Sequence, residues 1–133
     1  MTETGGLRQP TLCPYLYYED VPAAMDWLDR AFGFRERMRI TDAEGSVAHA
    51  EMELGDAVIM MGSPPGYKTA AALGQVTSSM YVQVGNVDEH YSRAVAEGAG
   101  VLREPADQDY GERNCGLTDI EGQHWWFTHP IAP

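Results

Sequence analysis

The chain has 133 residues, 44% of them hydrophobic and 22% charged, which suits a single domain with a buried core. Twenty acidic residues against nine basic ones give a formal net charge of −11. We therefore expect no nucleic acid partner, because phosphate binding relies on Lys and Arg. The chain has no apolar run near the roughly 20 residues of a membrane span and no signal peptide at its start, so we predict a cytoplasmic protein without a membrane partner.

The first half begins with residues 1–10, which we expect to be disordered, and a strand over 11–18. Asp20 can cap a helix whose apolar residues follow helical spacing at positions 24, 27, 28, 31 and 32, and Gly33 is placed to end it. Strand-like runs follow at 35–40, 47–54 and 57–61, separated by turns that contain Gly.

Residues 63–77 form a connector with two prolines, two glycines and no periodicity. It is either a surface linker or a flap over a ligand site. The apolar pattern of the second half then predicts a strand over 78–84 and a helix capped by Asp88. Tyr91, Ala94 and Val95 of this helix are expected to face inward. Strand-like runs close the chain at 100–103, 114–118 and 123–128.

The two halves repeat at a constant offset, which is the separation between Tyr15 and Tyr81. At this offset Asp20-Val21 corresponds to Asn86-Val87, Gly45 to Gly111, and Pro64 to Pro130. Each half is thus predicted to be a βαβββ unit, the first over 11–62 and the second over 78–130. Together they form a single α+β domain over 11–133.

Three segments of the chain are YEDVPAAMDWLDRAFGF, VGNVDEHYSRAVAEGAG and YGERNCGLTDIEGQHWWF. These segments resemble the vicinal oxygen chelate superfamily, which includes glyoxalase I, extradiol dioxygenases and bleomycin-resistance proteins. PYLYYED and VAHAEMELGDAVIMMGS are similar to a branch of small members related to phosphonate-operon and demethylubiquinone-methyltransferase-like proteins. The resemblance implies a curved mixed sheet around a cup that holds a metal or a ligand, usually in a homodimer.

Metal-dependent members of that superfamily place their ligands on the first and last strands of each unit. The matching positions are Cys13, Met60, Ser79 and Trp126, which form two pairs at the repeat offset. Trp has no metal-binding donor, Met is a soft thioether and Ser is a poor ligand. His124 is the one plausible donor within two residues of these positions. We therefore expect no metal and no other cofactor.

His49 and Glu51 lie two residues apart on a predicted strand and share one face. Cys115 is the counterpart of His49 at the repeat offset, so these three residues could form an atypical metal cluster. The alternative is a polar strand face without a metal. The two cysteines, Cys13 and Cys115, are too few for a disulfide framework, and we expect both thiols to be reduced.

Strand alternation places Trp126, His124 and Met60 on the cup side of the sheets. They either line an aromatic pocket or plug a closed core. Arg113 could hold a ligand carboxylate or pair with an acidic surface residue. The candidate ligand-binding residues are Cys13, Tyr15, Met60, Ser79, Arg113, His124 and Trp126.

The favoured function is metal-free binding of a small aromatic or cationic molecule, comparable with antibiotic sequestration by bleomycin-resistance proteins, in a homodimer. The alternative within the superfamily is a metal-dependent lyase, isomerase or dioxygenase. A metal-free enzyme that uses His124 or His49 as a general base, or an accessory protein without chemistry, stays open. The ligand and any catalysed reaction are undetermined at this point.

Overall fold

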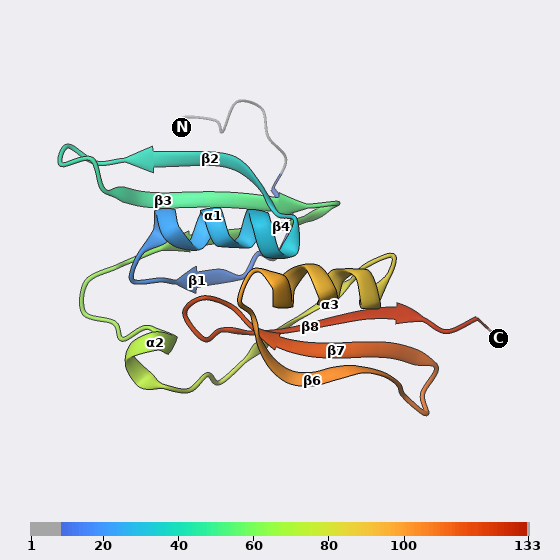
Figure 1. Cartoon of the computed structure of the whole chain (residues 1–133). Helices are drawn as coiled ribbons and strands as arrows, with labels where there is room; N and C mark the ends of the chain where they lie inside the picture. Colours follow the sequence, from blue (N-terminus) through green and yellow to red (C-terminus); the bar gives the residue numbers. More distant parts are fainter. Residues whose placement is uncertain (1–8, 133) are drawn as a thin grey trace.

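The computed structural model describes residues 9–132, so most of the segment expected to be disordered lies outside the described residues. The elements in chain order are β1 (Tyr15–Tyr17), α1 (Val21–Phe32), β2 (Arg35–Thr41), β3 (Val47–Leu54), β4 (Ala57–Gly62), α2 (Ala70–Leu73), β5 (Ser79–Gln83), α3 (Val87–Ala96), β6 (Gly100–Asp107), β7 (Glu112–Thr118) and β8 (His124–Pro130) (Figure 1). No helix of the described residues is long and apolar enough to cross a membrane.

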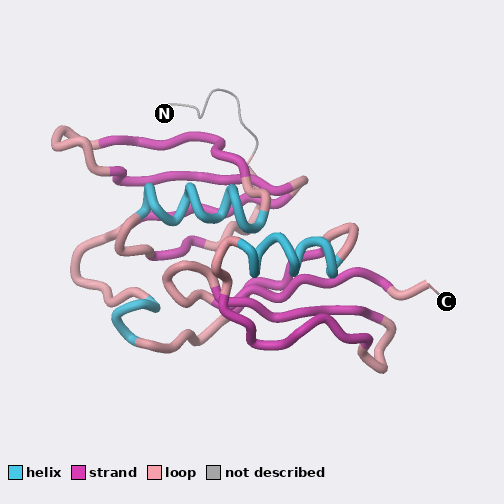
Figure 2. The backbone as a smooth tube through the Cα atoms, viewed as in Figure 1, coloured by secondary structure: helices cyan, strands magenta, loops and turns pink. Residues whose placement is uncertain are grey.

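Two four-stranded mixed sheets confirm the predicted α+β fold of two βαβββ units. The first has the strand order β1-β4-β3-β2 and the second β5-β8-β7-β6. In each sheet the first strand of the unit runs parallel to the last, and the other pairs are antiparallel. Figure 2 traces the two sheets with a helix along each. The repeat in the sequence is therefore a repeat of topology.

Strand register reproduces the repeat offset at the centre of each sheet. Tyr15 of β1 lies opposite Met60 of β4, and Tyr81 of β5 lies opposite Trp126 of β8. Strand β1 is shorter than the predicted run because Pro14 has no N–H to donate to a sheet ladder. Each unit thus has a tyrosine on its first strand that lies beside its last strand, and the two tyrosines are on equivalent faces of their sheets.

The offset becomes one residue shorter along β3 and β7. In β3, His49 lies opposite Ile40, whereas in β7 Asn114 lies opposite Ala106, the repeat counterpart of Ile40. An irregularity between Ile40 and Thr41 adds one residue to β3. His49 therefore corresponds to Asn114, and the proposed equivalence with Cys115 is wrong.

Helix α1 forms as predicted. The Asp20 side chain accepts a hydrogen bond from the backbone N–H of Ala23 at 3.0 Å, and Gly33 ends the helix with φ at 82°. Helix α3 is capped by Asn86, not by Asp88 as the sequence analysis expects, and Asn86 is the repeat counterpart of Asp20. Val95 is 39% exposed, so it does not belong to the inward stripe.

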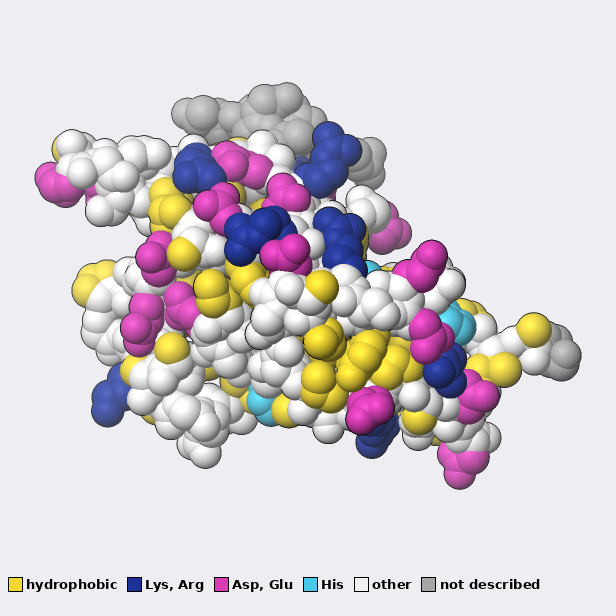
Figure 3. Space-filling view, in the orientation of Figure 1, with side chains coloured by type: hydrophobic (Ala, Val, Ile, Leu, Met, Phe, Trp, Pro, Cys, Tyr) yellow, Lys and Arg dark blue, Asp and Glu magenta, His cyan; other side chains and the backbone are white. Residues whose placement is uncertain are grey.

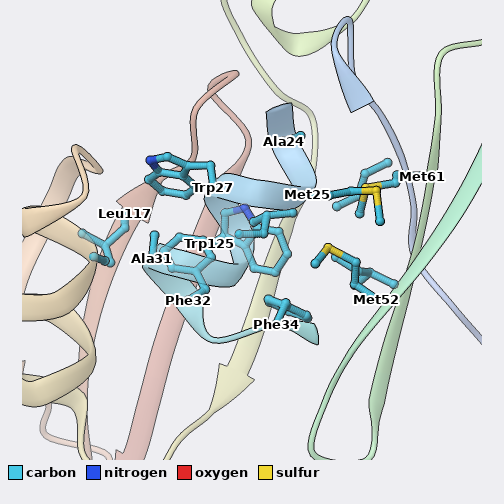
Figure 4. Close-up of a cluster of buried hydrophobic side chains, with 14 of the residues drawn as sticks. Ala24, Met25, Trp27, Ala31, Phe32, Phe34, Met52, Met61, Leu117 and Trp125 are labelled. Carbon is cyan, nitrogen blue, oxygen red and sulfur yellow. The ribbon is translucent and has the colours of Figure 1, made fainter. Parts of the chain in front are cut away.

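A single hydrophobic core joins both units. Figure 4 shows Phe32 of α1 in a cluster with Trp125 and Leu117 of the second unit, with Met52 and Met61 of the first unit beyond. The ring centroid of Phe32 lies 5.3 Å from that of Trp125 and 4.8 Å from that of Phe127. The helix of the first unit therefore packs against the sheet of the second.

The Asp119 turn links the units a second time. Its carboxylate accepts hydrogen bonds from the hydroxyl of Tyr18 at 2.5 Å and from the indole N–H of Trp125 at 3.0 Å. Burial raises the pKa of Asp119, although these hydrogen bonds act in the opposite direction. The D-x-x-G pattern at residues 119–122 thus fixes how the units pack.

The connector contains a short helix, α2, which the sequence does not predict. Thr69 caps it by accepting a hydrogen bond from the N–H of Ala72 at 3.2 Å, and Gly74 ends it in the left-handed conformation. The Thr69 hydroxyl also donates to Glu19 at 2.8 Å, which holds the connector against the first unit.

Candidate functional site

Each sheet has one face against the helices and one opposite face, which we call the outer face. On the first sheet the outer face carries Tyr15, Tyr17, His49, Glu51 and Met60, and on the second it carries Tyr81, Asn114, Trp126 and Thr128. The predicted alternation of strand β8 holds, because Trp125 and Phe127 are fully buried in the core. The same holds for β4, where Ile59 and Met61 are buried and Met60 is not.

A polar relay occupies the outer face of the first sheet. The Tyr15 hydroxyl lies 2.9 Å from Nδ1 of His49, and Nε2 of His49 lies 3.0 Å from Glu51. Glu51 is only 2% exposed, and its carboxylate lies 3.9 Å from the buried guanidinium of Arg37. We call Tyr15, His49 and Glu51 the tyrosine relay.

Cys115 does not complete a metal cluster with His49 and Glu51. Among residues 9–132, no group of three or more His, Cys, Asp and Glu side chains is arranged to hold a metal ion. Cys115 lies on the opposite, helix-facing side of its own sheet and is fully buried. Burial raises the pKa of Cys115 to about 11, so its thiol stays protonated near neutral pH.

Trp126 dominates the outer face of the second sheet. Its ring lies flat over Gly116, where an added Cβ would come within 2.5 Å of ring atoms. The guanidinium carbon of Arg103 lies 5.0 Å from the ring centroid, within range of a cation–π interaction. Arg103 also donates to Asn114 at 3.3 Å. We call Trp126, Gly116 and Arg103 the tryptophan platform.

Sequence reasoning misses Arg103 and Gly116. Arg103 lies in a predicted strand, but its partner Trp126 is distant along the chain, in a strand that is connected to β6 only through β7. Nothing in the sequence signals that Gly116 supports an aromatic ring. Tyr81 donates to Glu112 at 2.6 Å, so the counterpart of Tyr15 contacts a carboxylate instead of a histidine.

The structure places the seven predicted ligand-binding residues, except Cys13, on strands of both sheets. Tyr15 and Met60 are neighbours on the first sheet, and Ser79 and His124 face each other across β5 and β8 of the second. Cys13 is half-buried just before β1. The hydrogen bonds of Tyr15 and Tyr81 remain within their own sheets.

Arg113 pairs with acidic surface residues, which is one of the two roles that the sequence leaves open for it. Its guanidinium pairs with Asp88 at 2.9 Å and with Asp107 at 3.1 Å. These hydrogen bonds raise the pKa of Arg113 and lower that of Asp88. Arg113 therefore joins the start of α3 to β6 at the surface.

Donor chemistry decides whether the superfamily's metal fits this chain. The positions that match the ligands hold Cys13, Met60, Ser79 and Trp126. The Trp126 ring packs on Gly116 and offers no donor, and the side chains at the other three positions are not the oxygen and nitrogen ligands such a centre requires. A divalent metal centre at these positions does not fit the residues present.

Two cavities border the tyrosine relay. One, of about 190 Å³, is lined by Tyr15, Tyr17 and connector residues that include Lys68 and Leu73. The other, of about 740 Å³, lies between Tyr15, the start of α1 and the turn between β2 and β3. The connector therefore covers part of the outer face of the first sheet.

A third cavity, of about 410 Å³, lies at the junction of the units. Its walls include Val58 of the first unit and the predicted residue Ser79 of the second, together with Tyr81 and Trp125.

On the face of the molecule that Figure 3 presents, acidic side chains lie over both units with basic ones among them.

The fold agrees with the comparisons. Residues 10–127 match the Glyoxalase/Bleomycin resistance protein/Dioxygenase superfamily, and the chain belongs to that superfamily. The crystal structure of TioX from Micromonospora sp. ML1 is 32% identical in sequence and superposes with a TM-score of 0.72, covering 93% of this chain and 98% of TioX.

Two further relatives are more distant. An uncharacterised protein of Mycobacterium tuberculosis is 29% identical over 129 residues, which cover 92% of this chain and 76% of that protein. The PhnB protein of Bacillus cereus has the same fold, with 17% identity, a TM-score of 0.66 and coverage of 92% of this chain and all of that chain (100%). The superfamily and the fold are thus established.

Proposed function

We propose that this protein binds a small aromatic or cationic molecule on the tryptophan platform without a metal ion. The observation that carries the proposal is the Trp126 ring, which lies flat on the sheet over Gly116 and is partly exposed. A flat indole held in this way is a preformed stacking surface, so little conformational entropy is lost when a ring binds.

Arg103 defines what can bind to this surface. Its guanidinium already interacts with the Trp126 ring, so an aromatic cation would compete with Arg103 for the same π-system. The formal net charge of −11 favours the approach of a cation to the molecule as a whole. An incoming aromatic cation therefore replaces one cation–π interaction with another and adds stacking area.

A homodimer is part of this proposal. Helix α3 packs on the opposite face of the second sheet, which leaves the tryptophan platform open in a single chain. Because the two units repeat the same topology, the first unit of one copy can cover the second unit of another about a twofold axis, which closes two equivalent cups. We place this dimer in the cytoplasm, which the two free cysteines support.

Tryptophan fluorescence tests the platform, because Trp27 and Trp125 are buried and Trp126 is partly exposed. We expect N-methylquinolinium to quench the fluorescence of protein treated with EDTA in a saturable way. Replacing Trp126 by Leu should abolish the saturable quenching, and Arg103→Ala should strengthen binding of this cation several-fold.

Tetramethylammonium, a cation without a ring, serves as the control and should leave the fluorescence unchanged. Equal quenching of wild type and Trp126→Leu by N-methylquinolinium would refute the platform as the binding surface. A requirement for added metal before any quenching would refute the metal-free mode.

A further inference from the structure

We propose that the tyrosine relay is a second binding site, separate from the tryptophan platform, and that it recognises a protonated amine attached to an aromatic ring. The relay lies on the other sheet, and its Tyr15 lines a cavity of about 740 Å³. That volume is within the range of small-molecule sites.

The relay orients the hydroxyl of Tyr15. We assign a hydrogen to Nε2 of His49, which donates it to Glu51, because an ionised carboxylate only accepts. Nδ1 of His49 then accepts the hydrogen of the Tyr15 hydroxyl. The lone pairs of the Tyr15 oxygen are left for an incoming donor. The outward end of the relay therefore selects groups that carry N–H or O–H.

The fold keeps this arrangement in place. Glu51 and Arg37 have side chains that are only 3% exposed, and burying such a pair costs desolvation energy that packing alone does not require. Gly62 leaves the space for the Tyr15 hydroxyl, since a Cβ there would lie 2.7 Å from the phenolic oxygen. The extra residue in β3 sets the position of His49 opposite Ile40.

The repeat provides an internal comparison. Tyr81 occupies the same place in the second sheet, but it bonds to Glu112, and the counterpart of His49 is Asn114. The tyrosine relay therefore has no counterpart in the second unit, so the shared topology alone does not produce it.

The cavity selects for positive charge. The described residues that line it include the acidic residues Glu19, Asp20 and Asp42 and no Lys or Arg. Burial raises the pKa of Tyr15, so its hydroxyl stays neutral and acts through hydrogen bonds instead of as a phenolate. Tyr15 is 44% exposed and also offers its ring to the ligand.

Two cations of similar size test the proposal, benzylammonium with N–H donors and benzyltrimethylammonium without them. Binding is followed by NMR shifts of the backbone amides of residues 45–48, which line the cavity. We expect tighter binding of benzylammonium, with a loss of about tenfold in Tyr15→Phe, the size expected for a charge-assisted hydrogen bond. Binding of benzyltrimethylammonium should not change.

Tyr81→Phe is the matched control, because it removes the equivalent hydroxyl from the second sheet. Equal affinity of wild type and Tyr15→Phe for benzylammonium, or no shifts at residues 45–48, would overturn the inference. Long-range ¹H–¹⁵N NMR of His49 is an independent check that should show the Nε2–H form, and the Nδ1–H form would contradict the relay. Quenching at Trp126 is measured separately, so each site can fail without the other.

Discussion

At the residue scale, histidine placement is where local sequence reasoning is weakest. The sequence places His90 early on an amphipathic helix, where exposure is the usual outcome. In the structure its ring lies 4.1 Å from that of Phe127 and 5.7 Å from that of Phe32, measured between centroids. Its Nε2 lies 3.1 Å from the carbonyl oxygen of Phe32. His90 is thus a contact between α3 and the end of α1.

His90 should make the protein less stable in acid. Burial lowers the pKa of His90 in the folded state, whereas the unfolded chain binds a proton near the ordinary value of about 6.5. The contribution of the neutral His90 ring to the free energy of unfolding is therefore complete above about pH 6.5. It is lost as the pH falls towards the pKa of His90 in the folded state. We expect the free energy of unfolding to fall between pH 7.5 and pH 5.5, and to fall less in His90→Phe.

Urea denaturation of both proteins across this pH range measures the effect. The acidic groups of the two proteins are the same, so the difference between the two pH profiles isolates His90. Parallel pH profiles would show that the His90 ring is not held in its neutral form.

At the element scale, the fold was largely predictable from the sequence because its signals are local or repeated. The cap at Asp20, the stop at Gly33 and the apolar spacing between them define α1. The repeat offset then carries the same assignment to the second unit. What failed was the register of β3 and β7, since an extra residue in one strand leaves no mark on the apolar pattern.

The candidate site was harder to predict for a physical reason. Alternation places Met60, His124 and Trp126 on the cup side of their strands, but it says nothing about how the two sheets face each other. Arg103 with Trp126, and Tyr15 with His49, are contacts between strands whose separation along the chain has no sequence signature. Arg113 shows the same limit, because its partner Asp88 lies on α3.

The two units should unfold together, because α1 packs into both. Phe32→Ala removes a fully buried ring that contacts Trp125 and Phe127, and we expect a loss of about 3–5 kcal/mol. Tryptophan fluorescence reports Trp27 and Trp125, one in each unit, and circular dichroism reports both sheets. The two signals should shift together in urea, and separate transitions would contradict a single core.

At the scale of the whole molecule, an acidic chain of 133 residues folds into two equivalent units that differ in their outer faces. The first carries the tyrosine relay and the second the tryptophan platform. Neither face has the donors of the superfamily's metal centre at the positions that match its ligands, so we expect function to depend on aromatic surfaces and hydrogen bonds.

Native mass spectrometry of the full chain, purified without added metal and titrated with N-methylquinolinium, tests this account most directly. We predict a species with the mass of two chains that takes up the probe without the additional mass of a divalent metal. One tightly held Zn, Ni, Fe or Mn ion per chain, or uptake of the probe only after metal is added, would contradict the account.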